Sequence, residues 1–161
     1  IPVRSMIDKY TAKIAVFGGR IVPKDLYMET VKIGQLMARE NWLVFCGGGA
    51  GVMEAISRGV KLEKGTCIGI LKGTSDDEGN QYLSVPIKTG MGVARNAILA
   101  YNCDAAVAIG GQYGTLSEIA YALQLEKPIV GYKTWTIPKL ESIDTINEII
   151  IRLRNIISSN S

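Results

Sequence analysis

Short runs of apolar residues alternate along the whole chain with longer stretches in which apolar and polar positions follow helical spacing. Apolar runs of four to six residues bounded by glycine or polar residues are typical of buried strands. We expect strands at residues 13–17, 42–45, 66–71, 84–88, 105–109 and 128–131. Apolar positions three and four residues apart predict helices at residues 25–39, 52–63, 93–101, 116–125 and 144–157.

Strands that alternate with helices from end to end indicate an α/β protein. We predict a Rossmann-like, doubly wound parallel sheet of about six or seven strands, with helices on both faces. The length of 161 residues suits a single domain, residues 1–161, with its core at 13–131 and a closing C-terminal helix at 144–157. Because proline lacks an N–H group, Pro86 favours a position near an edge of the sheet or an end of its strand.

Glycine is concentrated where the predicted strands end. The chain has 18 glycines, about 11% of its residues, against roughly 7% in average proteins. Eleven of them lie in four short segments, at residues 18–19, 47–51, 90–92 and 110–114. The carboxyl ends of parallel strands meet at one edge of the sheet, where open α/β sheets bind ligands. We therefore expect these segments to form a ligand-binding rim.

Composition narrows the chemistry that this rim can perform. The chain contains no histidine, which excludes Ser-His-Asp and Cys-His triads, histidine metal sites and imidazole acid–base catalysis. Its formal charge of +3 is too small to favour a nucleic acid or an anionic membrane as partner. We expect neither of these partners and no metal site. Carboxylates, arginine, lysine, hydroxyls and backbone amides remain.

Three cysteines, Cys46, Cys67 and Cys103, lie in or beside apolar runs and form no CxxC pair. We interpret them as buried, reduced thiols and expect a cytoplasmic protein. No apolar run reaches 18 residues, and residues 1–13 lack the apolar centre of a signal peptide. We expect neither a transmembrane helix nor a leader.

The first glycine loop, residues 47–51 (GGGAG), joins a predicted strand to a predicted helix. A helix N-terminus presents unpaired amides that suit a phosphate. The G-x-G-x-G spacing differs from the dinucleotide fingerprint G-x-G-x-x-G, and Lys72 follows the next strand where a ribose-binding carboxylate would stand, so a nicotinamide dehydrogenase is disfavoured. The loop is not a Walker phosphate loop either, because no Gly-Lys-Ser/Thr follows it. The loop is thus either a phosphate cradle or a turn required for strand–helix packing.

The second glycine loop, residues 110–114 (GGQYG), also follows a predicted strand. Thr115 and Glu118 come next with the spacing of a capping box, which predicts that Thr115 caps a helix and that Glu118 returns the bond. The preceding glycines leave amides free for an anion, a role that can coexist with capping. Thr145 and Glu148 form a second capping box without glycines, which we interpret as purely structural.

Arg95 opens a predicted helix directly after the glycine pair at residues 90–92. A lone arginine is most often solvated or ion-paired at the surface, but this one falls on the predicted rim. A guanidinium binds phosphate through a planar fork of donors. Arg20, after Gly18 and Gly19, is a weaker candidate of the same kind.

Four segments together resemble the LONELY GUY (LOG) family, also labelled lysine-decarboxylase-like, and most closely its branch of molybdenum-cofactor carrier proteins. The resemblance runs from about residue 13 to residue 131. The segments that carry it are residues 17–19, 47–55, 92–96 and 110–118. The lysine-decarboxylase label has little support, because nothing here identifies a Schiff-base lysine with its pyridine-nitrogen partner.

In LOG enzymes the corresponding stretch reads P-G-G-x-G-T-x-x-E. In this chain, Gly110 replaces the proline and Gln112 replaces the second glycine. The positions that match the stretch are Gly111, Gly114, Thr115 and Glu118. The catalytic arginine of those enzymes falls on Arg95, but Asn96 replaces the lysine after it. The first glycine loop is one residue shorter than the G-G-G-x-x-G-L-M-G loop of LOG enzymes, and Glu54 stands in place of the last glycine of that loop. The Arg-Asn pair and the shorter loop resemble the carrier branch.

The resemblance implies two functions. The leading hypothesis is a binding or carrier protein for a phosphorylated, nucleotide-like ligand, either a nucleoside monophosphate or a molybdopterin-type cofactor. The alternative is a phosphoribohydrolase that cleaves the N-glycosidic bond of a nucleoside 5′-monophosphate, with Arg95 and Glu118 as catalytic residues and Glu54 as a possible second carboxylate. A third class is a Rossmann-like domain whose role is assembly, through residues 93–101 and the closing helix.

No cofactor is required under either of the first two hypotheses, although an AMP-like nucleotide or a molybdopterin-type cofactor is a possible bound ligand. We expect a homo-oligomer, dimer or tetramer, and a polar loop at residues 72–81 that closes over the ligand. The expected ligand-binding residues are Gly18, Gly19, Gly48, Gly49, Ala50, Gly51, Met91, Arg95, Asn96, Gly110, Gly111, Gln112, Tyr113, Gly114, Thr115 and Glu118.

Overall fold

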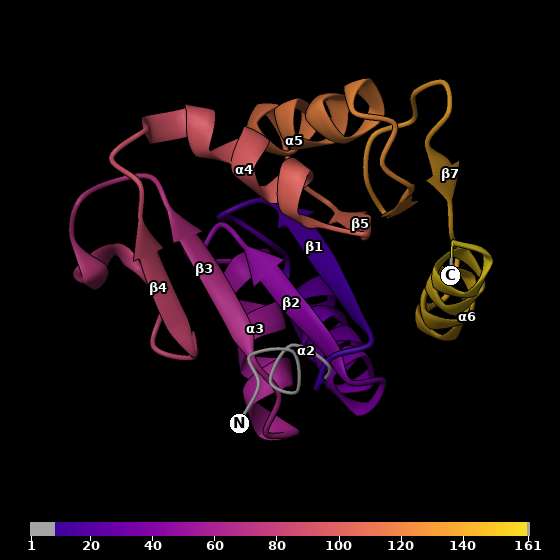
Figure 1. Ribbon diagram of the computed structural model, residues 1–161, viewed down its shortest axis with the longest axis horizontal. Coiled ribbons are helices and arrows are strands. Elements are labelled where there is room, and N and C mark those ends of the chain that lie inside the picture. The colour runs from indigo at the N-terminus through magenta and orange to yellow at the C-terminus, as the bar shows by residue number, and fades with distance from the viewer. Residues whose placement is uncertain (1–8, 161) are drawn as a thin grey trace.

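The protein contains one seven-stranded parallel sheet, seen in a computed structural model that describes residues 9–160 (Figure 1). The predicted domain also includes residues 1–8 and 161, which lie outside the residues that the structure describes. The strand order is β4-β3-β2-β1-β5-β6-β7, and every neighbouring pair is parallel. The strands are β1 (Ala12–Gly18), β2 (Trp42–Cys46), β3 (Cys67–Leu71), β4 (Val85–Lys88), β5 (Ala105–Ile109), β6 (Ile129–Tyr132) and β7 (Glu141–Ser142).

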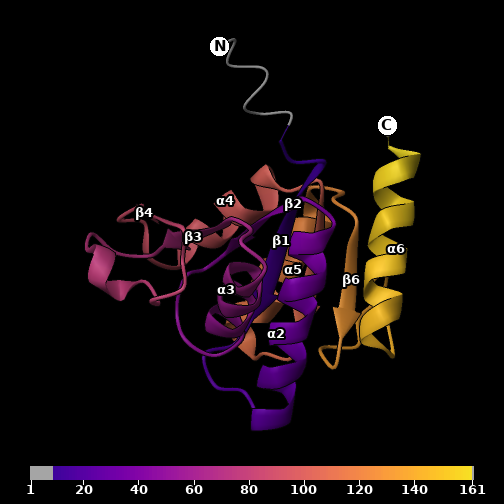
Figure 2. The same ribbon diagram turned by 90° about the horizontal axis from the view of Figure 1, so that it is seen from below.

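Helices cover both faces of this sheet, as the alternating pattern predicts; α4 and α2 lie on opposite sides of β1 (Figure 2). Apolar side chains of α2, α3 and α6 join one buried cluster, and those of α4 and α5 join the other. The described helices are α2 (Lys24–Arg39), α3 (Val52–Leu62), α4 (Arg95–Asn102), α5 (Tyr113–Gln124) and α6 (Ile146–Ser159), with short 3-10 turns η1 (Asp76–Glu78) and η2 (Gly92–Ala94).

The predicted Rossmann-like α/β fold is confirmed, and most element boundaries agree to within two residues. Pro86 lies on the edge strand β4, as expected. The helix predicted at residues 93–101 begins instead with η2, and α5 begins three residues earlier than expected, at Tyr113. The two-residue strand β7 was not predicted, because a Glu-Ser pair carries no apolar pattern.

The order of strands reverses beside β1, because the chain adds β2, β3 and β4 on one side and β5, β6 and β7 on the other. Ligands of open α/β sheets bind at such a switch point, beyond the carboxyl ends of the strands. Gly18 ends β1, and the two glycine loops follow β2 and β5, so the three segments share this edge. None of the described helices is long and apolar enough to span a bilayer.

Candidate ligand-binding site

A cavity of about 470 Å³ opens at this switch point. Small-molecule sites usually measure roughly 300–1,000 Å³, so the cavity has the size of a ligand site. Its walls come from the loops after β1, β3 and β5, the turn η2 and the first turns of α3, α4 and α5. The lining residues are Gly18, Gly19, Arg20, Ile21, Met53, Lys72, Val93, Arg95, Asn96, Gly111, Gln112, Gly114, Thr115 and Glu118.

Arg95 is held rigidly in this wall, with only 6% of its surface exposed. Its Nη1 donates to the carbonyl oxygens of Gly47 (2.6 Å) and Ile70 (2.5 Å), and its Nε donates to Oδ1 of Asn96 at 2.6 Å. Gly47 makes room for this contact, since a Cβ there would lie 2.6 Å from Nη1. Nη2 has no such partner among the described residues, so one edge of the guanidinium remains for an anion.

Two further cations, Arg20 and Lys72, line the same cavity. Burial lowers the pKa of Lys72, and the positive charges of Arg20 and Arg95 lower it further. Burial is also the main reason that the pKa of Arg95 is lowered, although Glu118 opposes this effect. Three cations that destabilise one another in this way form a site that an anion would stabilise.

Glu118 is the carboxyl group of the cavity, and it is 7% exposed. Burial raises its pKa to about 8, against the opposing effect of Arg95. At neutral pH the group is therefore mostly protonated. A protonated carboxyl donates a hydrogen bond, whereas a carboxylate only accepts. Glu118 thus has the form that suits an acceptor oxygen of an anionic ligand.

The prediction that Thr115 caps a helix is wrong. Helix α5 begins at Tyr113 with Gln112 as its N-cap residue, and no side chain caps it, because the 110–114 loop turns into the helix earlier than the capping motif implied. The hydroxyl of Thr115 is buried without a hydrogen-bond partner. By contrast, the Thr145 hydroxyl accepts the expected bond from the backbone N–H of Glu148.

The N-terminus of α5 faces this cavity with open amides. The first amide bond within α5 runs from Leu116 to the carbonyl of Gln112, so the preceding N–H groups have no helical acceptor. Gly111 packs directly on Thr115, since a Cβ there would lie 2.0 Å from its Oγ1. Free amides, the positive end of the helix dipole and an unpartnered hydroxyl together form an anion site.

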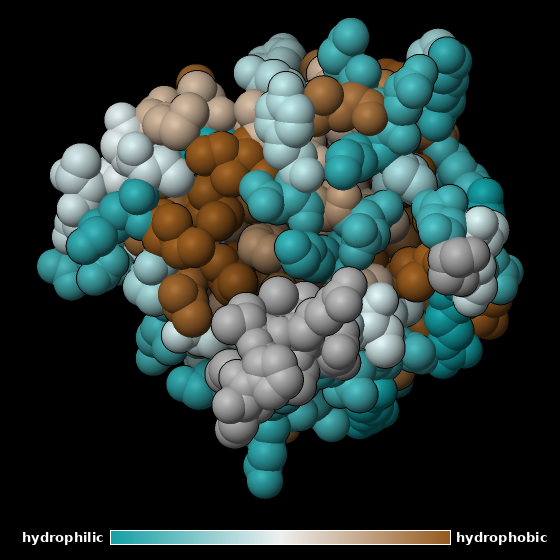
Figure 3. Space-filling view, viewed as in Figure 1, coloured by the Kyte–Doolittle hydropathy of each residue, from teal (hydrophilic) through white to brown (hydrophobic). Residues whose placement is uncertain are grey.

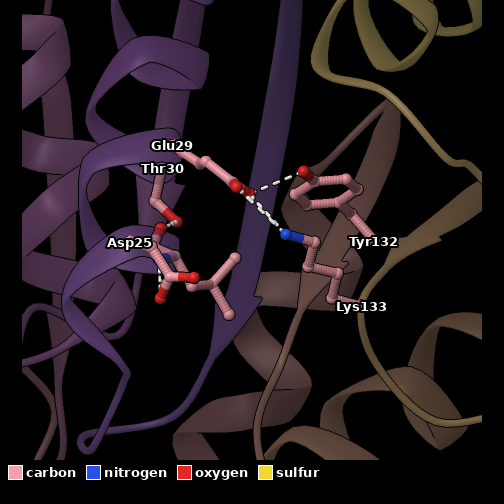
Figure 4. A network of polar contacts seen from close by, with 6 residues as sticks. Asp25, Glu29, Thr30, Tyr132 and Lys133 are labelled. Carbon is pink, nitrogen blue, oxygen red and sulfur yellow. Dashed lines mark hydrogen bonds and ion pairs between the residues drawn. The ribbon is translucent and has the colours of Figure 1, made fainter.

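A polar network joins α2 to the end of β6, next to the second glycine loop in the sheet (Figure 4). Glu29 of α2 accepts hydrogen bonds from Tyr132 Oη (2.6 Å) and Lys133 Nζ (3.0 Å) at the end of β6. The hydrogen bond from Tyr132 is the main reason that the pKa of Glu29 is lowered. The backbone carbonyl of Tyr132 accepts a hydrogen bond from the N–H of Gly110, so the contact of Tyr132 with α2 lies next to this loop.

The first glycine loop is organised differently, because its amides bond within the protein. The N–H of Gly48 contacts Cys46 Sγ and that of Gly49 contacts Met53 Sδ, both at 3.4 Å. Gly51 packs on the β1–α2 connection, where a Cβ would lie 2.2 Å from the carbonyl oxygen of Gly19. The loop therefore supports the cavity wall from behind.

Nine of the residues expected to bind ligand line the cavity, namely Gly18, Gly19, Arg95, Asn96, Gly111, Gln112, Gly114, Thr115 and Glu118. The structure does not bring the remaining seven to its wall, namely Gly48, Gly49, Ala50, Gly51, Met91, Gly110 and Tyr113. Glu54 does not line the cavity either. Sequence reasoning gave Arg20 little weight and missed Ile21, Met53, Lys72 and Val93 as cavity residues. The signal available for Lys72 was its position directly after β3.

The family model of the SLOG cluster4 family matches residues 11–156. This chain belongs to the SLOG cluster4 family. The LOG-like resemblance of its motifs is thereby confirmed. Among sequences, an uncharacterized protein of Archaeoglobus fulgidus is 36% identical over 121 residues, which cover 75% of this chain and 80% of that protein.

Solved structures similar to this SLOG chain include two molybdenum cofactor proteins. The molybdenum cofactor binding protein of Rippkaea orientalis is 30% identical, with a TM-score of 0.80, over 90% of this chain and 95% of that one. The molybdenum cofactor carrier protein of Chlamydomonas reinhardtii is 28% identical, with a TM-score of 0.82, over 91% and 98%. The likeness to the carrier branch is thus confirmed at the level of fold and family.

Proposed function

We propose that this protein binds and carries a small phosphorylated ligand of the molybdopterin type. The observation that carries the proposal is the combination, in one cavity, of three cations with the open N-terminus of α5 and the unpartnered hydroxyl of Thr115. Two similar structures, described as a molybdenum cofactor binding protein and a carrier protein, support the choice of ligand class.

The residues present fit the phosphate and ring parts of such a cofactor. The amides at the start of α5 and the hydroxyl of Thr115 would hold the phosphate, and Arg95 and Lys72 would neutralise its charge. Ile21 and Val93 provide apolar surface for a ring system. Since neither Cys nor His is among the lining residues, the protein would hold the molybdenum only through its organic cofactor.

Mass spectrometry of the protein purified under anaerobic conditions tests this proposal. We expect a co-purified molybdopterin-type species, and we expect the addition of the extracted cofactor to raise the melting temperature of the apoprotein. A Thr115→Val variant should show a smaller rise. Equal shifts in both proteins, or no shift with any phosphorylated ligand, would contradict the proposal.

The hydrolase hypothesis retains one supporting observation, since Arg95 and Glu118 line the same cavity. Stabilisation of an oxocarbenium-like state requires an ionised carboxylate. The pKa of Glu118, about 8, leaves that form scarce at neutral pH. Any release of adenine from AMP should therefore be slow near pH 7 compared with its rate above pH 8. If hydrolysis occurs, its rate should rise with pH through about 8 and vanish in Glu118→Gln.

Two expectations from the sequence remain proposals. We propose that the protein acts in the cytoplasm, which its three buried, free cysteines support. We also propose that it forms a homo-oligomer, dimer or tetramer.

A further inference from the structure

Buried polar side chains are concentrated at the cavity. Among the described residues, six polar or charged side chains are buried. Four of them line the cavity, namely Arg95, Asn96, Thr115 and Glu118. The other two, Thr30 and Ser57, donate to backbone carbonyls within their own helices. Burial of a polar group is costly unless the group forms hydrogen bonds, so the partners of Asn96, which is 5% exposed, indicate its task.

The side-chain amide of Asn96 lies in the middle of a directed chain of three hydrogen bonds. Arg95 Nε donates to Asn96 Oδ1 at 2.6 Å, and Asn96 Nδ2 donates to Ser117 Oγ at 3.0 Å. Ser117 Oγ in turn donates to the carbonyl oxygen of Gly114 at 2.7 Å. A guanidinium can only donate, so Arg95 fixes which end of the amide is the oxygen. The Nδ2 end therefore faces Ser117, whose own proton is left for Gly114.

Helical geometry alone does not produce the contact between Arg95 and Asn96. They are the first two residues of α4, and the side chains of adjacent residues on a helix normally diverge. The outer surface over β3 and β4 and beside α4 is largely hydrophobic (Figure 3). The two polar residues that open α4 are buried instead, so both side chains turn inward and meet at the cavity.

The chain of hydrogen bonds spans both sides of the switch point. On one side, Arg95 Nη1 donates to the carbonyl oxygens of Gly47, directly after β2, and of Ile70 in β3. On the other side, the chain ends at Gly114 in the first turn of α5, which follows β5. Strands β2 and β5 flank β1 from opposite sides. Asn96 is therefore the link that sets the guanidinium relative to the start of α5.

We propose that Asn96 is a positioning residue, which fixes the Arg95 guanidinium against the first turn of α5 so that both bind the phosphate of one ligand. The inference rests on the proposed function, and it gives Asn96 a role that acts through Arg95. Because Nε and Nη1 are bonded to the protein, Nη2 is the nitrogen that remains for the phosphate. The amides of Gly114 and Thr115, which precede the first amide bond of α5, are its other donors. Donors that are fixed in advance lose less conformational entropy when the ligand binds.

The Nε–H signal of Arg95 in ¹⁵N NMR spectra tests this positioning without any ligand. The signal that disappears in Arg95→Lys identifies it, and a buried, hydrogen-bonded N–H exchanges slowly with water. We expect Asn96→Ala to shift the signal and to raise its exchange rate by about tenfold or more. Asn96→Asp, which keeps an acceptor for Nε, should leave it protected. Asn102→Ala is the matched control, because Asn102 lies on the same helix and its amide donates to the backbone carbonyl of Ile98.

The affinity for inorganic phosphate, measured by calorimetry in a double-mutant cycle, tests whether Asn96 acts through Arg95. We expect Asn96→Ala and Arg95→Lys each to weaken phosphate binding by about tenfold, and Asn102→Ala to leave it unchanged. The double variant at positions 95 and 96 should bind phosphate no more weakly than Arg95→Lys alone. A residue that only supported the fold would weaken binding by the same factor in both backgrounds.

Three outcomes would overturn the proposal: an Arg95 signal that exchanges freely in the wild type, an unchanged signal in Asn96→Ala, or additive losses of affinity in the cycle. If Asn96→Ala does not fold, Asn96→Leu replaces it, since leucine has a similar size and offers no acceptor. A wild type that binds no phosphate would count against the proposed function. The NMR measurement on the ligand-free protein then decides by itself whether Asn96 positions Arg95.

Discussion

The two glycine loops follow β2 and β5, the two neighbours of β1, yet they perform opposite tasks. In the first loop, the amides of Gly48 and Gly49 bond to the sulfur atoms of Cys46 and Met53. Gly51 lacks a side chain where the backbone carbonyl of Gly19 packs against it. In the second loop, the turn leads directly into α5, whose first amides have no helical acceptor, and the Thr115 hydroxyl is buried there without a hydrogen-bond partner. Glycine content alone therefore does not distinguish close packing from ligand binding.

The largest effect should come from Gly51→Ala in the first loop. Its φ of +69° disfavours any side chain, and a Cβ would lie 2.2 Å from the carbonyl oxygen of Gly19. We expect the free energy of unfolding to fall by about 3 kcal/mol in urea denaturation. Gly114→Ala in the second loop is the control. Nothing lies within 4 Å of its Cβ position, and we expect little change. Equal losses would remove the distinction between the loops.

Glu118→Gln should stabilise the ligand-free protein by about 3 kcal/mol at pH 7. The folded pKa of Glu118, about 8, exceeds the ordinary value of 4.5, so between these pH values the unfolded chain releases a proton that the folded chain keeps. The stability of the wild type relative to the variant is therefore highest below pH 4.5. It should fall by about 1.4 kcal/mol for each pH unit up to about 8. Urea denaturation at several pH values measures this slope, and parallel curves for the two proteins would contradict the prediction.

Asn80→Ala tests whether the first loop has only a supporting role. The Asn80 side-chain amide donates to the carbonyl oxygens of Gly48 (3.3 Å) and Gly49 (3.0 Å). Loss of these bonds should lower the free energy of unfolding by about 2 kcal/mol. The affinity of the folded protein for its phosphorylated ligand, measured by calorimetry, should stay within about twofold, well under 1 kcal/mol. A tenfold weaker affinity would place the first loop in the binding site.

Thr115→Val and Thr145→Val should have opposite effects of about 1 kcal/mol. The first removes a buried hydroxyl without a partner, so the ligand-free protein should become more stable. The second removes the N-cap of α6 and should destabilise it. Only Thr115→Val should weaken ligand binding, by about tenfold. Thermal melts with and without ligand measure both effects, and loss of stability in both variants would show that Thr115 has a structural partner.

The sequence by itself determined the order of strands and helices along the chain and the edge of the sheet at which the cavity opens, and it limited Pro86 to an edge of the sheet or an end of a strand. These features depend on local periodicity and on the rule that parallel strands end together. It also identified Gly111, Arg95 and Glu118 as cavity residues, because each lies in or shortly after a glycine turn at that edge. It failed at Thr115, where a capping motif predicted a bond that the earlier start of α5 removed.

Only the tertiary structure decided which amides remain open, which residues join the cavity from other segments, and which cavity groups are buried. Lys72 enters the site from the end of β3, and Arg95 reaches back to carbonyls of β3 and of the loop after β2. The protonation of Glu118 follows from burial by neighbours distant in the sequence. Each of these properties depends on atoms that only folding brings together, so no local pattern along the chain contains them.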